Sequence, residues 1–558
     1  MTKRQRREIH HTKWIGAVLV GILIVVLIVT FTSKKTNKRN NKQIIVGMTQ
    51  EPNTLDPLFS EMAASFEGLG LIFEDMVERD DHWEYHPRLV TEISSFENGL
   101  VKRLHGNKIQ ATWHLKEGLK WADGTPITPQ DFIFTHQMIM DDRLPIISRD
   151  TDRRIEKMET PDDHTLIVTW KEPYAYYFLG HAAIPKHIVE SEYQKNPEKY
   201  HESFFNKKPM GNGPFQLAEW ASGSHMIFER NPHWTGANPV FEKVIYKFIT
   251  STNALESNLL SGTIDAISPL GLSLDQALDF ERRHGDKFTF HYKPALTWEH
   301  IDCNLENPIL KDKRVRQALL YGANRQMISD VLFQGKQQVA DSWLPPKHYG
   351  YNPKIKHYPY DPDKAKKLLE EAGWVESTDG IRVNNRGDKL RLTIMATAGN
   401  KTREQTEQIL QSDWRKIGID LEIVNQPGQV FFGETMRHRK FKHLALYAWM
   451  MSPVSDGESL WTKENIPSEK NSWQGQNTPG WVHEEANKLD HQVPVTLDEN
   501  KRKELLQQEQ VIWAEEVPAL PLFFRSDISV TPKNLENWKM TGTLTPITWN
   551  AETWKFAN

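Results

Sequence analysis

The chain has 558 residues, of which 38% are hydrophobic and 25% charged, an ordinary composition for globular protein. This length exceeds what one hydrophobic core supports, so at least two domains are expected. Residues 1–43 carry ten Lys or Arg and one Glu, whereas the remainder carries 59 basic and 72 acidic residues, a net charge of −13. Such an acidic remainder has no electrostatic surface for nucleic acid, which we exclude as a partner. The single cysteine, Cys303, excludes an intramolecular disulfide and a cysteine-based metal site.

The N-terminus is interpreted as a membrane anchor with polar flanks. Residues 14–33 are uncharged and long enough, as a helix, to span a hydrocarbon core of about 30 Å. A cleavable signal peptide is the alternative, but its apolar region is usually shorter and ends in a small-x-small site, which is missing here. The basic segment 1–13 precedes the anchor, and the polar stretch 34–43 is typical of a flexible stalk. Five basic residues on each side leave the orientation undecided by charge.

From residue 44 onward the chain alternates predicted strands with predicted helices. In the first half, short apolar or alternating runs predict strands at 44–48, 111–115, 164–170 and 240–249. Thr128 is expected to cap a helix beginning at Pro129, because Pro suits the first helical position and Asp131 suits the first turn. A second helix is expected over 252–260, ending before Gly262.

The second half continues the alternation. Residues 310–333 are strongly helical with a break near Gly322. Asp361 is expected to start a helix that Gly373 closes. The remaining predicted elements are a strand over 390–397, a helix from 402, a stop at Gly418 and a strand that ends at 424. Strand–helix–strand units of this length predict an α/β fold.

Eight sequence blocks then occur in an order that resembles one known family. They are EPNTLDP (51–57), WHLKEGLKWADGTPITPQDFIFT (113–135), GNGPFQLAEW (211–220), ERNPHWTG (229–236), SGTIDAI (261–267), DKRVRQALLYGANRQMI (312–328), YDPDKAKKLLEEAGW (360–374) and EEVPALPLFF (515–524). Each block alone is a weak signal. Together, in this order, they make the chain similar to the substrate-binding proteins of peptide, nickel and related ABC importers, the family 5 extracellular solute-binding proteins.

The resemblance implies a fold and a domain division. The expected architecture is a two-lobed, periplasmic-binding-protein-like α/β fold with a subdomain inserted in the first lobe, here preceded by one transmembrane helix. The implied ranges are 44–294 for the first lobe, about 88–209 for its inserted subdomain, 295–521 for the second lobe and 522–558 for the return to the first lobe. The chain would cross between the lobes near 290–300 and return near 520. Lobes of such proteins close about a hinge when ligand binds.

The resemblance also implies where a ligand would bind. In this family a carboxylate three residues after a Trp receives the ligand's ammonium group; Trp449 aligns here, Ser452 stands at the carboxylate position, and Asp456 follows four residues later. Dipeptide-selective relatives hold the ligand's carboxylate with an Arg where this chain has Thr397, and Arg403 lies just beyond. A core role for Trp449 and a solvent-exposed helix start at Arg403 are the competing interpretations. The loss of both clamps favours longer or end-blocked peptides over free dipeptides.

Enzyme motifs are missing from the sequence. It contains no G-x-S-x-G elbow, no P-loop and no G-x-G-x-x-G. His82 and His86 have i,i+4 spacing, but no carboxylate partner is arranged as in a zinc protease motif. We therefore expect no enzyme activity, no cofactor and no metal. The predicted function is a membrane-tethered, extracytoplasmic solute-binding protein that captures peptides for an ABC importer permease. The alternative is a tethered ligand sensor or scaffold that no longer serves a transporter; neighbouring permease and ATPase genes would favour import.

Overall fold

The computed structural model describes residues 41–60, 62–146, 149–454, 456–471 and 473–557. Contacts between residues group 44–558 into one compact unit, and the elements below belong to it. Across the described residues no helix is both long and apolar enough to cross a membrane. The predicted anchor at 14–33 lies outside the described residues.

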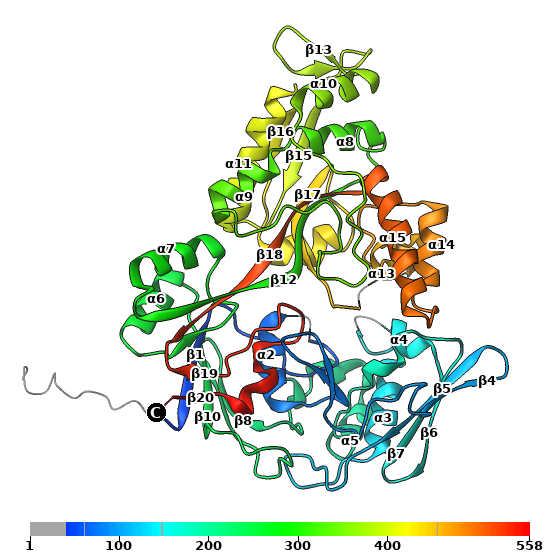
Figure 1. The fold of residues 1–558 in the computed structure, drawn as a ribbon, viewed down its shortest axis with the longest axis vertical. Coiled ribbons are helices and arrows are strands. Elements are labelled where there is room, and N and C mark those ends of the chain that lie inside the picture. The colour runs from blue at the N-terminus through cyan, green and yellow to red at the C-terminus, as the bar shows by residue number, and fades with distance from the viewer. Residues whose placement is uncertain (1–40, 61, 147–148, 455, 472, 558) are drawn as a thin grey trace, which may run out of the picture. The chain divides into compact units, whose positions relative to one another are not determined.

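A ten-stranded sheet forms the frame of the molecule, in the order β16-β15-β17-β12-β18-β11-β1-β10-β9-β8 (Figure 1). Its strands are β1 (Gln43–Met48), β8 (Phe215–Ala221), β9 (His225–Arg230), β10 (Lys243–Phe248), β11 (Ala266–Ile267), β12 (Phe288–Cys303), β15 (Arg391–Met395), β16 (Asp420–Ile423), β17 (Leu444–Met450) and β18 (Ala519–Pro532). The two longest, β12 and β18, are antiparallel to each other and run between two groups of shorter strands.

These two long strands divide the sheet into two lobes. The second half of β12 pairs with β17, from Thr297 to Cys303, and thereby joins the second-lobe strands β15–β17. Toward its C-terminal end, β18 pairs with β11 through Val530 and Ile267, and thereby joins the first-lobe strands. The chain therefore passes between the lobes twice, in the middle of β12 and in the middle of β18.

A separate four-stranded antiparallel sheet lies within the range proposed for the inserted subdomain. Its order is β4-β5-β7-β6, with β4 (Val101–Leu104), β5 (Lys108–His114), β6 (Ile155–Asp162) and β7 (Thr165–Trp170). The helices α3 (Pro129–Ile139), α4 (Asp150–Arg153) and α5 (Lys186–Lys195) accompany it. The buried Trp113 and Trp170 belong to a hydrophobic core of its own, so this sheet folds around its own apolar interior.

The remaining elements cover the two lobes. Those of the first lobe are α2 (Ala63–Ile72), β2 (Val77–Arg79), β3 (Tyr85–Pro87), α6 (Thr252–Leu260), α7 (Leu274–His284), β19 (Leu535–Glu536) and β20 (Lys555–Phe556). Those of the second lobe are α8 (Lys313–Tyr321), α9 (Arg325–Phe333), α10 (Pro362–Glu371), β13 (Val375–Glu376), β14 (Arg382–Val383), α11 (Lys401–Lys416), α12 (Gly428–Val430), α13 (Glu458–Trp461), α14 (Glu484–Gln492) and α15 (Glu499–Glu516). Short 3-10 turns at 177–179, 197–202, 204–206, 463–465, 469–471 and 547–553 and a π turn at 431–436 complete the chain.

Local signals in the sequence explain several element boundaries. The Asp131 carboxylate accepts the Thr128 N–H at 2.9 Å, which starts α3 at the predicted Pro129. Gly418 has φ 89°, a left-handed conformation that ends α11 at little cost for Gly. The predicted strand over 240–249 is shorter than expected, because β10 begins at Lys243 while the Val240 N–H donates to the Glu552 carbonyl at 3.1 Å.

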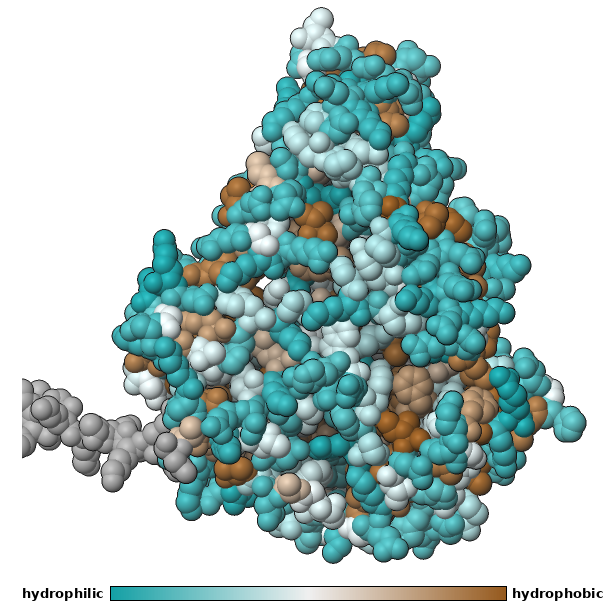
Figure 2. All heavy atoms as spheres, in the orientation of Figure 1, coloured by the Kyte–Doolittle hydropathy of each residue, from teal (hydrophilic) through white to brown (hydrophobic). Residues whose placement is uncertain are grey.

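The outer surface in view is mostly hydrophilic, as Figure 2 shows. Apolar side chains reach the surface at several places, one of them at the level where the inserted subdomain faces the second lobe (Figure 2). That junction is where the candidate site lies.

Candidate functional site

A cavity of about 460 Å³ lies between the inserted subdomain and the second lobe. The inserted subdomain contributes Tyr174 and Tyr176, which follow β7, and the second lobe contributes Trp449, Asp456 and Glu458, which follow or end β17. Both sides therefore supply aromatic and polar groups to one partly open cavity. A cavity of this size with a few polar groups on apolar walls is typical of a small-ligand site.

Trp449 lies near the end of β17 and has two environments. Its backbone pairs with Trp298 of β12, and its ring meets the Tyr447 ring edge-on, with centroids 5.7 Å apart. The side chain is half-buried and also lines the cavity. Trp449 therefore packs partly on the core and partly offers its ring to the cavity, so neither of the two competing interpretations describes it alone.

Asp456 brings the only carboxylate of the five candidate residues into the cavity. One of its oxygens accepts the Glu458 N–H at 3.2 Å, and Tyr176 lines the opposite wall of the cavity. Burial, and next the neighbouring Glu458 carboxylate, raise the pKa of Asp456 to about 7. At neutral pH this carboxyl is therefore only partly ionised, which weakens it as a receiver of an ammonium group.

Ser452 lies in the turn that follows β17. Its hydroxyl oxygen accepts the Val454 N–H at 3.2 Å. Ser452 is not among the described residues that line the cavity. At this position the chain thus has a neutral turn residue rather than a charged ligand contact.

Thr397 and Arg403 form a second group, near the ends of β15 and the start of α11. The Arg403 guanidinium donates to the Glu299 carboxylate at 2.5 Å and to the Thr397 hydroxyl at 3.0 Å. The Arg403 side chain is 11% exposed and that of Glu299 is 5% exposed. The interpretation of Arg403 as a solvent-exposed helix start is therefore wrong. Its guanidinium is mostly buried in an ion pair with Glu299, 104 residues earlier in the chain.

The buried Glu299 neutralises this arginine. Burial alone would raise the pKa of Glu299, but the charges of Arg403 and Arg525 outweigh burial and lower it. The pair lines a smaller pocket of about 100 Å³, with Arg525 on its wall. Four of the five predicted residues thus fall into two places: Trp449 and Asp456 line the cavity of about 460 Å³, and Arg403, with its partner Thr397, lies at the smaller pocket. The fifth, Ser452, is in the lining of neither.

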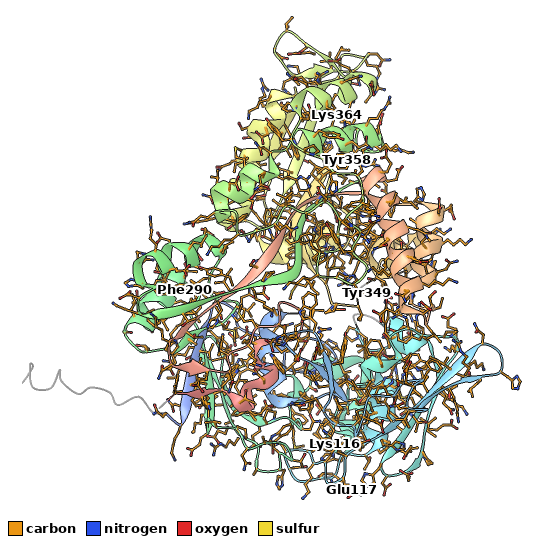
Figure 3. The ribbon with its side chains drawn as sticks, viewed as in Figure 1. Lys116, Glu117, Phe290, Tyr349, Tyr358 and Lys364 are labelled. Carbon is orange, nitrogen blue, oxygen red and sulfur yellow. The ribbon has the colours of Figure 1, made fainter. Side chains whose placement is uncertain are left out.

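Contacts across the larger cavity join the two lobes. The Arg154 guanidinium, which lies between α4 and β6, donates to both oxygens of Glu458 on α13 at 2.6 and 2.7 Å. The Ala175 N–H donates to the Pro494 carbonyl at 2.7 Å. Tyr349 lies at the junction of the lobes in Figure 3. The lobes are therefore in contact on this side of the molecule.

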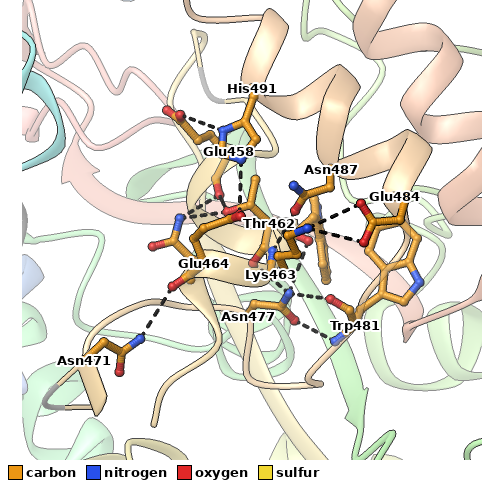
Figure 4. A network of polar contacts seen from close by, with 12 residues as sticks. Glu458, Thr462, Lys463, Glu464, Asn471, Asn477, Trp481, Glu484, Asn487 and His491 are labelled. Carbon is orange, nitrogen blue, oxygen red and sulfur yellow. Dashed lines mark hydrogen bonds and ion pairs between the residues drawn. The ribbon is translucent and has the colours of Figure 1, made fainter. Parts of the chain in front are cut away.

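Glu458 is also held from within the second lobe. His491 on α14 contacts Glu458 at 3.3 Å through one ring nitrogen and Glu464 at 3.1 Å through the other (Figure 4). Sequence reasoning missed Arg154 and Glu458, whose positions are 304 residues apart. The aromatic run at 174–178, directly after a predicted strand, was the one local signal that could have indicated this wall.

The histidines of the sequence HWEYH do not form a convincing metal centre. Among the described residues, Asp80 groups with Glu84 and His86, and with Asp81 and His82, at distances suited to an ion. The Asp80 carboxylate, however, accepts the N–H groups of His82 and Glu84 and pairs with the His86 ring at 2.9 Å. The geometry of a β2–β3 turn accounts for this exposed cluster.

Two lobes joined by two crossing strands, with a cavity walled by both, are typical of a solute-binding protein. This chain belongs to the bacterial extracellular solute-binding proteins of family 5: the family model described as "Bacterial extracellular solute-binding proteins, family 5 Middle" matches residues 85–465. The family predicted from the eight sequence blocks is thereby confirmed, and it is a family of binding proteins rather than enzymes.

Three similar proteins illustrate the relationship. The oligopeptide-binding protein AppA of Bacillus subtilis (strain 168) is 26% identical over 508 residues, 89% of this chain and 88% of that protein. The dipeptide-binding protein of Escherichia coli (strain K12) is 26% identical over 73% of this chain and 77% of its own length. The solved oligopeptide-binding protein of Thermus thermophilus, complexed with a pentapeptide, has a TM-score of 0.81 and 30% identity and covers 92% of this chain and 96% of its own. The two-lobed α/β fold is confirmed by this match.

Proposed function

We propose that this protein captures peptides longer than dipeptides, or peptides with blocked ends, outside the cytoplasm and delivers them to an ABC importer permease. The cavity at Trp449 receives the peptide, and the lobes close about β12 and β18. The uncharged segment 14–33 holds the protein at the membrane. The oligopeptide-binding relatives, one of them complexed with a pentapeptide, support a peptide as the ligand class.

The preference for longer peptides is inferred from the two positions where relatives hold the charged ends of a dipeptide: neither offers a free charge here. The Arg403 guanidinium is already paired with Glu299 at 2.5 Å, and Ser452 has no charge at the position where a carboxylate is expected. Asp456 lines the cavity, but its pKa of about 7 leaves it partly neutral. A buried, unpaired terminal charge costs several kcal/mol, and about 1.4 kcal/mol is already tenfold in affinity.

A longer peptide avoids this cost. Its termini extend beyond the cavity into water, while its backbone and side chains use hydrogen bonds and aromatic contacts. Trp449 supplies an aromatic surface, and Tyr174 and Tyr176 supply two more from the opposite wall. The binding free energy then comes from the middle of the ligand rather than from its ends.

Calorimetry on the purified protein tests the proposal with three ligands of related sequence: a dipeptide, a pentapeptide, and the same pentapeptide acetylated and amidated at its ends. We expect the dipeptide to bind at least about a hundredfold more weakly than the pentapeptide, and end-blocking to change the affinity by less than about tenfold. Micromolar binding of ordinary dipeptides would contradict the proposal and would indicate that Asp456 and Arg403 act as clamps after all.

The anchor is tested independently of the ligand. N-terminal sequencing of protein extracted from membranes should find the chain beginning at or near Met1. A mature N-terminus near Lys34 would show that the apolar segment is a cleaved signal peptide.

A further inference from the structure

A second, larger hollow lies at the crossing of β12 and β18. It has a volume of about 680 Å³ and is lined by 294–296 of β12 and 524–526 of β18. The second lobe adds 335–339 and 345–347, and the first lobe adds Trp83. This hinge pocket shares no lining residue with the cavity at Trp449, although Gln337, Arg525 and Ser526 also line the small pocket at Arg403.

The hinge pocket lies where the sheet is interrupted. Pro294 pairs with Ser526 and Trp298 pairs with Phe524, so the three residues 295–297 of β12 lie opposite the single residue Arg525 of β18. The Phe524 N–H donates sideways to the Gln338 carbonyl at 2.8 Å. An extra segment on one strand bends the pair and opens space beside it. Because both strands connect the lobes here, a ligand bound in this pocket would contact the hinge strands β12 and β18 directly.

The described lining of the hinge pocket is positively charged. It includes Lys336, Lys347 and Arg525 and, among the residues the structure describes there, no Asp or Glu. Carboxylates outside this lining, among them Asp527 near Arg525, compensate part of this charge. Lys336 lies 3.8 Å from Glu281 and Arg525 lies 3.9 Å from Glu299, both at the outer limit of an ion pair.

One further group of the lining lacks a hydrogen-bond partner, and one of the three cations contacts the first lobe. The Gln337 side chain is 5% exposed, and its amide oxygen is buried without a hydrogen-bond partner. The amide can present its N–H side to an anion in place of that oxygen. The Lys347 ammonium lies 5.7 Å from the centre of the Trp83 ring, so a cation of the second lobe rests on an aromatic residue of the first.

We propose that the hinge pocket binds a small multivalent oxyanion, held by Lys336, Lys347 and Arg525. Such an anion neutralises the three cations where the two crossing strands separate. It also stabilises the 335–347 segment of the second lobe, whose Lys347 contacts Trp83 of the first lobe. Its binding therefore stabilises the arrangement of the lobes seen here. The anion would influence lobe closure at the hinge without contacting the peptide cavity. Anion binding itself does not depend on the identity of the peptide ligand.

Titration of the full-length protein in a non-ionic detergent, at constant ionic strength and without peptide, tests the inference. Inorganic phosphate and citrate are the two probes, and calorimetry is the readout. We expect saturable binding of one anion per chain, tighter for citrate than for phosphate because citrate carries more charge and reaches more of the three cations. The two arms thereby separate phosphate-type from polycarboxylate-type ligands.

The matched variants decide where the anion binds. The double variant Lys336→Gln with Lys347→Gln should weaken binding at least about tenfold, whereas Lys367→Gln, an exposed lysine on α10 away from the pocket, should leave it unchanged. Both pocket lysines are solvent-accessible, so thermal unfolding should show that the double variant keeps its fold. The inference is overturned by the lack of saturable binding of either anion, or by equal affinity in the wild type and the folded double variant.

Discussion

At the scale of single residues, the candidate site depends on which charged groups remain free. Arg403 is near the position implied by the family resemblance, yet Glu299 holds it. Asp456 lines the cavity, yet burial raises its pKa to about 7. A side chain of the expected type in the expected segment is therefore not enough for a clamp, because its partners decide whether its charge is available to a ligand.

A single substitution should restore a clamp at the turn after β17. Ser452→Asp keeps an oxygen for the Val454 N–H, which the serine hydroxyl accepts at 3.2 Å, and adds a negative charge. We expect calorimetry to show about tenfold tighter binding of a pentapeptide with a free α-amino group and no gain for its acetylated form. Ser452→Asn, which has nearly the same shape without the charge, is the control; an equal gain with Asn would contradict an ionic effect.

Truncation of the aromatic wall should act on both peptides alike. Trp449→Ala removes the ring that packs against Tyr447 and lines the cavity. We expect the free and the end-blocked pentapeptide to lose affinity by a similar factor, about tenfold or more, because aromatic contact does not depend on terminal charge. Calorimetry with both peptides measures this. A loss confined to the free peptide would show that Trp449 serves the ammonium group instead.

At the scale of elements, α14 and α15 bury two carboxyl groups against each other. Asp490 is fully buried and neither of its oxygens has a hydrogen-bond partner, while the Trp343 indole donates to Glu509 at 3.1 Å. Burial raises the pKa of Glu509 to about 8, and burial together with Glu509 raises that of Asp490 well above its usual value. Asp490 also lies so close to Gly457 that a Cβ there would collide with its carboxylate. The pair thus supports the segment that carries Asp456 and Glu458.

This pair should make stability depend on pH. An acid whose pKa is higher in the folded than in the unfolded chain stabilises the fold at low pH, and that contribution is lost as pH rises from about 4 to about 8. Glu509→Gln removes the ionisable group. We expect its free energy of unfolding to decline less over this range than that of the wild type, by about 2–4 kcal/mol, in denaturant unfolding at several pH values. Glu504→Gln, on the exposed face of α15, should keep the wild-type slope; an unchanged slope in Glu509→Gln would contradict the assignment.

At the scale of the whole molecule, contacts between the lobes set how readily they separate. Arg154 and Glu458 form an ion pair in which Nη2 of the guanidinium contacts both carboxylate oxygens, with side chains 15% and 21% exposed. The Ala175 N–H also donates to the Pro494 carbonyl between the same two parts of the chain. Charge-assisted, partly buried pairs of this kind are stronger than exposed ones. Ligand binding that requires closed lobes therefore benefits from this pair, although the pair need not touch the ligand.

Loss of this pair should weaken ligand binding through closure. Arg154→Gln should reduce pentapeptide affinity by about tenfold and increase the radius of gyration of the ligand-free protein in solution scattering. Glu172→Gln is the matched control, because it removes the other carboxylate partner of Arg154, 2.7 Å away within the same subdomain, and leaves the pair between the lobes intact. Equal losses in both variants would mean that Arg154 acts only inside its own subdomain.

The sequence by itself determined the family and most of the elements. Caps and stops such as Asp131 before α3, the break at Gly322 and Gly418 after α11 act over a few residues, so their physical effect can be recognised locally. Motif order along the chain then led to the family and to its two-lobed fold. These inferences succeeded because the interactions behind them are short in sequence or shared by a family.

Only the tertiary structure decided which charges are free and which surfaces meet. Arg403 meets Glu299 across 104 residues, and Arg154 meets Glu458 across 304. No local pattern specifies such partners, because the strength of an ion pair depends on distance, burial and the other charges around it. The same is true of the hinge pocket, whose lining combines residues of β12 and β18 with two segments of the second lobe and Trp83 of the first. The sequence therefore indicated the kind of protein, and folding determined the chemistry of its cavities.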